Sequence, residues 1–237
     1  MGIIKTKGII LAQNNMSEND KMVTILTPDL GKIGCAARGS RRPKSTLMAG
    51  TQFLCFADFI IYKGVSSYNL NSAEPIEIFY NIRLDIDKLK YAVEVAKIAN
   101  DITEENEGSY RILQLVLNTL YMISESNKEL DFILSIYKLR LLSIIGFRPI
   151  IEKCSNCGKN EELRYFSFID NGFKCKNCKT QDKGAIELSD ATIKAIKFII
   201  KAEPKKIFSF DIAEENKKQL KLLTKIYLDK CIEKEYD

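Results

Sequence analysis

The chain of 237 residues contains no histidine. Without histidine it cannot form the Ser-His-Asp or Cys-His arrangements of nucleophilic catalysis, and it cannot hold a catalytic zinc ion through imidazole ligands. Carboxylates and lysines could still perform chemistry, but no paired constellation of them stands out in the sequence. We therefore expect a protein that is not an enzyme.

Long hydrophobic runs are also missing. No stretch of about 18 apolar residues occurs, so the sequence predicts no transmembrane helix. The first residues, Met1 to Lys5, do not have the pattern of a signal peptide. Three of the seven cysteines, Cys35, Cys55 and Cys231, lie in apolar surroundings outside any motif, as buried thiols in a reducing compartment do. These features predict a cytoplasmic protein with no membrane partner.

The other four cysteines form two Cys-x-x-Cys pairs, Cys154 with Cys157 and Cys175 with Cys178. Their spacing is typical of a structural zinc site, in which two tight turns each offer two thiolates and together complete a tetrahedron. Two disulfides or four free thiols are the alternatives, and a thioredoxin-like motif fits less well because it occurs singly. Gly158 follows the first pair, where backbone freedom is useful. A closed site leaves no position for a substrate, so we expect one structural Zn²⁺ ion.

The first 76 residues favour short β-strands separated by turns. The expected strands are Lys7–Ala12, Lys21–Thr27, Leu30–Ala37, Gln52–Tyr62 and Tyr68–Leu70. In the fourth strand every second residue from Phe53 to Ile61 is apolar, as in a half-buried strand. Five such strands suggest a barrel of the OB type, and from Glu74 onward we expect a connecting segment.

Beyond residue 76 the apolar residues recur with the period of a helix. The expected helices are Leu89–Ile102, Ile112–Ile123, Leu130–Ile145, Asp190–Lys201 with Ser189 as its N-cap, and Ala213–Cys231. Helices thus lie on both sides of the cysteine motif. The sequence predicts a multidomain α+β fold with an OB-fold barrel at 1–76. An α-helical domain at 77–237 carries a four-Cys zinc ribbon inserted at about 152–185.

One segment of the predicted barrel holds most of its charge imbalance. From Gly31 to Gly50 there is no Asp or Glu, and the cations are Lys32, Arg38, Arg41, Arg42 and Lys44. Gly39 and Pro43 favour an irregular surface loop. Arginine makes bidentate contacts with phosphate. An isolated run of five cations would be read as a solvated loop without a ligand, but on a small barrel with aromatic residues on its strands the run favours nucleic acid. Aromatic residues on the strands could stack on bases, although each is more simply read as core: Phe53, Phe56 and Tyr62.

The motifs, taken in order, resemble the bacterial recombination-mediator family RecO. The first two stretches that carry the resemblance are Gly8–Leu11 with Ser17–Pro28, and Gly31–Ile33 leading to Arg38–Ser45. The others are Leu139–Leu142 through Gly146–Pro149, and the cysteine quartet. Arg38 stands where the family usually has lysine, which keeps the charge.

The resemblance implies an OB-fold domain followed by a helical domain with a zinc ribbon, in a bacterial, nucleoid-associated protein. It implies binding of single- and double-stranded DNA and annealing of complementary strands. It also implies loading of RecA recombinase, together with RecR, onto strands coated by single-stranded-DNA-binding protein (SSB). The candidate DNA contacts are Lys21, Lys32, Arg38, Arg41, Arg42, Lys44 and Ser45. The acidic SSB tail would dock on the helical domain, with Lys138 and Arg140 as candidate contacts.

Three other functions remain open at this level. The chain could be a protein-interaction scaffold whose basic loop is only solvated. It could be an RNA-binding module, because OB folds and zinc ribbons also serve translation. A nuclease that uses carboxylates or lysine is disfavoured by the missing histidines and by the lack of a clustered acidic motif.

Overall fold

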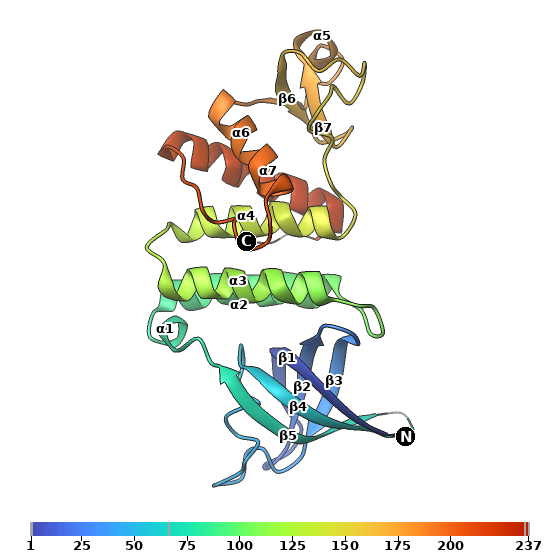
Figure 1. Ribbon diagram of the computed structural model, residues 1–237, viewed down its shortest axis with the longest axis vertical. Helices are drawn as coiled ribbons and strands as arrows, with labels where there is room; N and C mark the ends of the chain where they lie inside the picture. Colours follow the sequence, from blue (N-terminus) through green and yellow to red (C-terminus); the bar gives the residue numbers. More distant parts are fainter. Residues whose placement is uncertain (1, 66, 235, 237) are drawn as a thin grey trace. The chain divides into compact units, whose positions relative to one another are not determined.

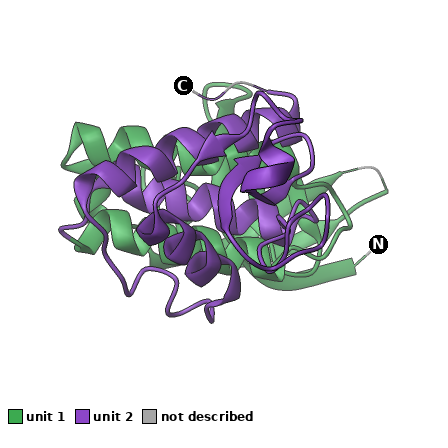
Figure 2. Ribbon diagram, turned by 90° about the horizontal axis from the view of Figure 1, so that it is seen from above, with its two compact units in different colours: residues 1–126 green, residues 127–237 purple. Residues whose placement is uncertain are grey.

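The computed structural model describes residues 2–65, 67–234 and 236 (Figure 1). The chain forms two compact units, Met1–Ser126 and Asn127–Asp237 (Figure 2). The first unit holds both the barrel and the helices that directly follow it, so the domain division expected at residue 76 stays a prediction. No helix in the described residues has the length and hydrophobicity that a membrane span requires.

The first unit begins with a closed five-stranded barrel in the order β1-β2-β3-β5-β4. Its strands are β1 (Gly2–Asn15), β2 (Lys21–Thr27), β3 (Gly31–Ala37), β4 (Phe56–Lys63) and β5 (Tyr68–Glu77). Neighbouring strands are antiparallel except β3 and β5, which pair in parallel from Cys35–Tyr68 to Ala36–Asn69 and close the barrel. A five-stranded barrel of this kind is an OB fold, so the predicted fold class is confirmed.

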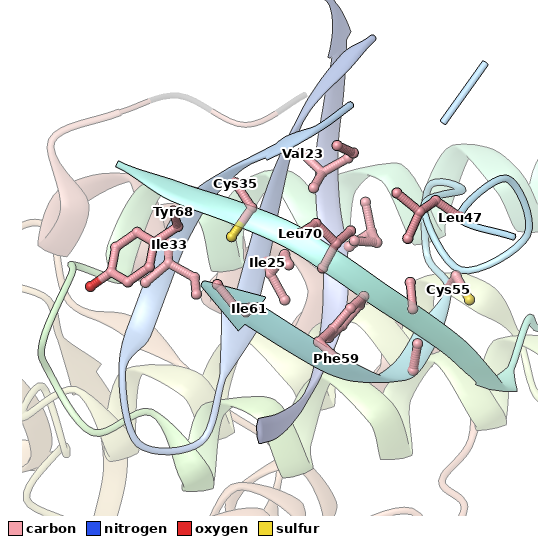
Figure 3. Close-up of a cluster of buried hydrophobic side chains, with 14 residues drawn as sticks. Val23, Ile25, Ile33, Cys35, Leu47, Cys55, Phe59, Ile61, Tyr68 and Leu70 are labelled. Atoms are coloured by element: carbon pink, nitrogen blue, oxygen red, sulfur yellow. The ribbon is translucent and has the colours of Figure 1, made fainter. Parts of the chain in front are cut away.

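Alternate side chains of the strands fill the barrel (Figure 3). Val23 and Ile25 of β2 lie beside their pairing partners Cys35 and Ile33 on the neighbouring strand β3, and all four side chains are fully buried in the barrel interior. Leu47, from the segment between β3 and β4, joins the same cluster (Figure 3). Because successive side chains of a strand point to opposite faces, every second residue points into the apolar interior and the others point outward.

Two strands are longer than the sequence predicted. β1 pairs with β4 from Gly2 to Ile9 and with β2 from Ile9 to Asn15, so one continuous strand serves two partners. β5 continues to Glu77 through Pro75, where a connecting segment was expected, so that expectation is wrong. Since β3 pairs only with the start of β5, the later part of β5 has one free edge, and a strand edge tolerates proline. The expected strand at Gln52 starts instead at Phe56.

Three helices complete the first unit: α1 (Tyr80–Arg83), α2 (Ile86–Ile102) and α3 (Tyr110–Glu125). The side chain of Asp85 caps α2 by accepting the N–H groups of Asp87 and Lys88. The helix α2 contacts β1, and α3 contacts β2. Ile9 and Leu26, at neighbouring positions of these strands, are completely buried.

The second unit combines three packed helices with a small ribbon. The helices are α4 (Leu130–Ile144), α6 (Asp190–Lys201) and α7 (Glu214–Ile232). The predicted cap of α6 is confirmed, because Ser189 Oγ accepts the N–H of Thr192 at 3.1 Å. The ribbon contains β6 (Leu163–Ser167), β7 (Gly172–Cys175), α5 (Lys176–Lys179) and β8 (Ile186–Glu187), and its sheet order is β7-β6-β8. The ring of Phe166 in β6 packs edge-on against Tyr227 of α7 at 5.3 Å.

Candidate nucleic-acid interface and metal centre

Residues 38–45, here called the basic loop, leave the end of β3 in successive tight turns. The N–H of Arg42 donates to Gly39 O at 3.1 Å, and the N–H of Ser45 donates to Arg42 O at 3.1 Å. Gly39 has a φ of +69°, a left-handed conformation that glycine adopts without steric cost. The loop therefore has a defined backbone path that fixes where its side chains start.

The turn between β1 and β2 anchors the basic loop. Asp20 Oδ1 accepts the N–H of Gly39 at 2.7 Å, and Asn19 O accepts the N–H of Arg41 at 3.0 Å. The guanidinium of Arg41 donates to Ser17 O at 2.9 Å. The bond from Gly39 is the largest influence on Asp20 and, with the positive charge of Arg42, lowers the pKa of its carboxyl. One carboxylate thus holds a loop of cations in place.

The basic loop presents a group of exposed cations at one end of the barrel. The exposed side chains are Arg38, Arg41, Arg42 and Lys44, whereas Ser45 is half-buried. Lys21 opens β2 opposite Ala37, and its ammonium donates to Gln13 Oε1 at 2.9 Å. Partial burial, with the nearby charge of Arg41, lowers the pKa of Lys21. Within the described residues, none of these cations forms an ion pair with a carboxylate, so their charge is available to a ligand.

Lys32 does not join this group. Its ammonium donates at 2.6 Å to Asn100 O in the last turns of α2, where unpaired carbonyls give the helix a partial negative charge. The backbone of Lys32 also donates to Glu104 O at 3.0 Å, beside a stretch that includes Glu105 and Glu107. Four of the five expected cations therefore lie in the basic loop. Lys32 instead belongs to β3, and its ammonium binds a carbonyl at the end of α2.

The three candidate aromatic residues have different surroundings. Phe53 and Phe56 are half-buried, whereas Tyr62 is exposed over 38% of its surface on β4. The interpretation of all three as core residues is wrong for Tyr62. Phe53 does not lie in a strand; it lies in the segment just before β4, beside the side chains of Gln52 and Arg83.

The four cysteines of the paired motif come together in the ribbon. The sulfur atoms of Cys154, Cys157, Cys175 and Cys178 all lie within 4.8 Å of one another, and those of Cys157 and Cys175 are 3.8 Å apart. Zinc–sulfur bonds of about 2.3 Å in a tetrahedron require sulfur–sulfur distances of about 3.8 Å, so the group fits Zn²⁺. After the first pair, Gly158 turns the chain with φ +75°, and its N–H donates to Cys154 O.

The backbone around Cys154 favours its thiolate. Burial of this side chain works against ionisation, but N–H groups of Cys157, Cys175 and Asn156 point at the sulfur and bring the pKa of Cys154 to about 6. A deprotonated sulfur is the form that binds metal. Burial and hydrogen bonds with the other cysteines raise the pKa of Cys178 to about 12, so the fit to zinc rests on the arrangement of the four sulfur atoms. Four thiolate ligands leave no open position for a substrate, so the ion would be a structural one.

Comparison with known proteins assigns the chain to a family. A family model described as "Recombination protein O N terminal" matches residues 1–79, and one described as "Recombination protein O C terminal" matches residues 83–236. The chain belongs to the RecO family.

Relatives over the full length agree with this assignment. The DNA repair protein RecO of Acetivibrio thermocellus is 39% identical over 237 residues, which covers 100% of this chain and 94% of that protein. The RecO of Alkaliphilus metalliredigens is 33% identical over 96% of this chain and 95% of its own length. Family membership supports a role in DNA repair and recombination.

The two residues considered for the SSB tail, Lys138 and Arg140, lie on α4. Lys138 is 6% exposed. Arg140 donates from Nη1 to Ile199 O at 2.9 Å and to Ile200 O at 2.7 Å, which are carbonyls near the end of α6. Arg140 therefore joins α4 to α6 inside this RecO chain, and a docking role for the pair stays a prediction.

Proposed function

We propose that this chain mediates DNA repair and homologous recombination by binding single- and double-stranded DNA through the basic loop and annealing complementary strands. The observation that carries the proposal is the group of exposed cations at one end of the OB barrel, which have no carboxylate partner in the part of the chain that the structure describes. Arg38, Arg41, Arg42 and Lys44 supply the charge, with Lys21 beside them. Lys32 is left out of the proposed interface because its ammonium donates to Asn100 O at the end of α2.

The proposed mechanism requires no bond to be broken. Two DNA strands repel each other because both carry phosphate charges, and each holds a shell of counterions. A cationic surface that contacts phosphates releases counterions and lowers the repulsion between the strands. Guanidinium groups suit this role because one group can meet two phosphate oxygens. The protein thus brings strands together, and base pairing between them supplies the specificity.

The partners in this proposal are those that the resemblance to the RecO family implies. RecR would act with this chain to load RecA onto single strands coated by SSB, with a cytoplasmic, nucleoid-associated location. The ribbon would hold one Zn²⁺ through Cys154, Cys157, Cys175 and Cys178, and the ion would stabilise the fold of the ribbon without taking part in a reaction.

Charge reversal in the basic loop tests the DNA interface. The double variant Arg41→Glu/Arg42→Glu should bind a single-stranded oligonucleotide at least about tenfold more weakly at low salt, because phosphate contacts are replaced by repulsion. The control Lys218→Glu/Lys225→Glu makes the same change in net charge on exposed positions of α7. Equal loss in both variants would mean that only net charge matters, and unchanged affinity in the loop variant would refute the interface.

Annealing tests the function itself. Two complementary oligonucleotides, each coated with SSB, should anneal faster with this protein than without it, and the loop variant should lose the acceleration. Preference for structured RNA over single-stranded DNA would favour the RNA-binding alternative. DNA cleavage with Mg²⁺ would favour a nuclease, and binding to partner proteins without DNA affinity would favour a scaffold.

A further inference from the structure

The outer face of β2 and β3 offers no ring on which a base could stack. Alternation places Met22 and Thr24 of β2 outside, and they pair with Ala36 and Gly34 of β3. Lys32, the cation on this face, is bonded to the end of α2. Single-strand binding by OB folds usually combines cations with aromatic platforms. If this barrel has such a platform, the platform lies outside this face.

A groove of about 480 Å³ lies at the barrel end where β1 ends and β2 begins. Its lining includes Gln13, Lys21, Met48, Gln52, Phe53 and Arg83. The remaining lining side chains are apolar, and no carboxylate is among them. This volume lies within the range of small-ligand sites, and the combination of apolar walls with two cations suits a ligand that is flat and anionic.

The position of Phe53 is fixed before any ligand arrives. The next residue, Leu54, has φ +62°, and its N–H donates to Ile10 O of β1 at 3.0 Å. Arg83 donates to Phe53 O at 3.0 Å and to Gln52 Oε1 at 2.5 Å. Because the backbone on both sides is held, the half-buried ring lines the groove without needing to be ordered by the ligand.

Lys21 connects the groove with the basic loop. It lines the groove, and its charge is close enough to Arg41 for the two to influence each other. The oxygens of Gln13 and Gln52 accept from Lys21 and Arg83, which leaves the amide N–H₂ groups of both glutamines without protein acceptors in the described residues. A strand held by the basic loop could therefore place its next nucleotide in the groove.

We propose that this groove binds one nucleotide of a single strand, with the base stacked on Phe53 and against Met48. Lys21 meets the adjoining phosphate, and the amide groups of Gln13 and Gln52 donate to acceptor atoms on the edge of the base. The inference rests on the proposed function, since the basic loop supplies the rest of the strand. It also explains how the chain would distinguish a single strand from a duplex, in which the base is stacked and unavailable.

The test compares two oligonucleotides of equal length and equal phosphate number, one with bases and one with abasic sites at several central positions. The wild-type protein should bind the strand with bases about tenfold more tightly, because stacking contributes to affinity while phosphate contacts stay the same. This comparison needs no variant, so it does not depend on the folding of an altered chain. Equal affinity for the two strands would overturn the proposal.

Variants then locate the effect. Phe53→Ala should lose the difference between the two strands, whereas Tyr62→Ala, which removes an exposed aromatic ring elsewhere on the barrel, should keep it. If Phe53→Ala also keeps the difference, the base is bound elsewhere and the groove proposal is wrong. The Arg41→Glu/Arg42→Glu variant separates the two proposals. Its loss of binding to both strands supports the basic loop, whatever the result at Phe53.

Discussion

Asp20 accepts the backbone N–H of Gly39 at 2.7 Å, and this bond joins the turn between β1 and β2 to the start of the basic loop. The carboxylate lies within the field of Arg38 and Arg42, whose positive charges contribute to the lowering of its pKa. An acidic residue at the edge of a proposed DNA interface would repel phosphate on its own. The Asp20 carboxylate instead accepts a hydrogen bond from the basic loop and lies near Arg38 and Arg42, so its negative charge is partly neutralised.

The Asp20 bond predicts a response to acid. The pKa of Asp20 in the folded protein lies below its ordinary value. The stability that the bond contributes is therefore fully present above the unfolded pKa of about 3.9, and it is lost as the pH falls through the folded pKa. Asp20→Ala should speed hydrogen exchange at the amides of Gly39 and Arg41, while Asp20→Asn, which keeps an oxygen acceptor, should retain part of the protection. Unchanged exchange in Asp20→Ala would show that other contacts hold the loop.

The different surroundings of Lys32 and Arg42 predict opposite effects of neutral substitutions. Lys32→Gln should lower the free energy of unfolding by about 1 kcal/mol, because the bond to Asn100 O is weakened, and should leave DNA affinity nearly unchanged. Arg42→Gln should leave stability unchanged. A plot of the logarithm of the binding constant against the logarithm of salt concentration should have a slope of about −3.5 if Lys21 and the four loop cations each contact one phosphate, and Arg42→Gln should make it shallower by about 0.7. Thermal melts would measure the stability of both variants, and DNA binding at several salt concentrations would measure their salt dependence. A shallower salt dependence in Lys32→Gln would show that Lys32 does contact DNA.

Local sequence patterns predicted much of the fold. The strand Lys21–Thr27 and the helix Asp190–Lys201 were predicted with the bounds that they have, because alternation and the Ser189 cap act within a few residues. The course of β5 past Pro75 could not be predicted, since it depends on β3 leaving one edge of β5 unpaired.

The candidate site shows the same contrast. The cysteine spacing predicted the sulfur cluster because both turns are local and the ribbon between them is short. The separate place of Lys32 depends on the end of α2, which lies far along the chain at Asn100. The groove combines residues from Gln13 to Leu89, and the contact of Arg83 with Phe53 O has no signal in the sequence.

The ribbon contains a buried ion pair that predicts a large loss of stability. Lys174 and Asp182 lie 3.1 Å apart, and their side chains are 5% and 2% exposed. A hydrogen bond from Ser167, followed by the contact with Lys174, lowers the pKa of Asp182. Lys174→Met should lower the stability of the ribbon by about 3 kcal/mol, because it leaves a carboxylate buried without its cation.

The double variant Lys174→Met/Asp182→Leu is the control for this ion pair. Removing both charges should recover part of the loss, as replacement of a buried pair by apolar side chains often does. Hydrogen exchange in β6 and β7 would measure the effect on the ribbon. A double variant less stable than the sum of the two single variants would contradict this account.

The metal centre predicts that zinc and the ribbon are lost together. The purified protein should contain about one zinc ion per chain. Cys157→Ser is the sharpest variant because Cys157 is the exposed member of the quartet, so its substitution removes a ligand without opening a cavity. Cys231→Ser, at a half-buried thiol outside the quartet, is the matched control and should keep its zinc.

Since zinc binds thiolates, the ion should be released as pH falls, and the packing of Phe166 on Tyr227 should loosen with it. A metal-free protein that keeps full amide protection in β6 and β7 in reducing buffer would contradict a structural role for zinc.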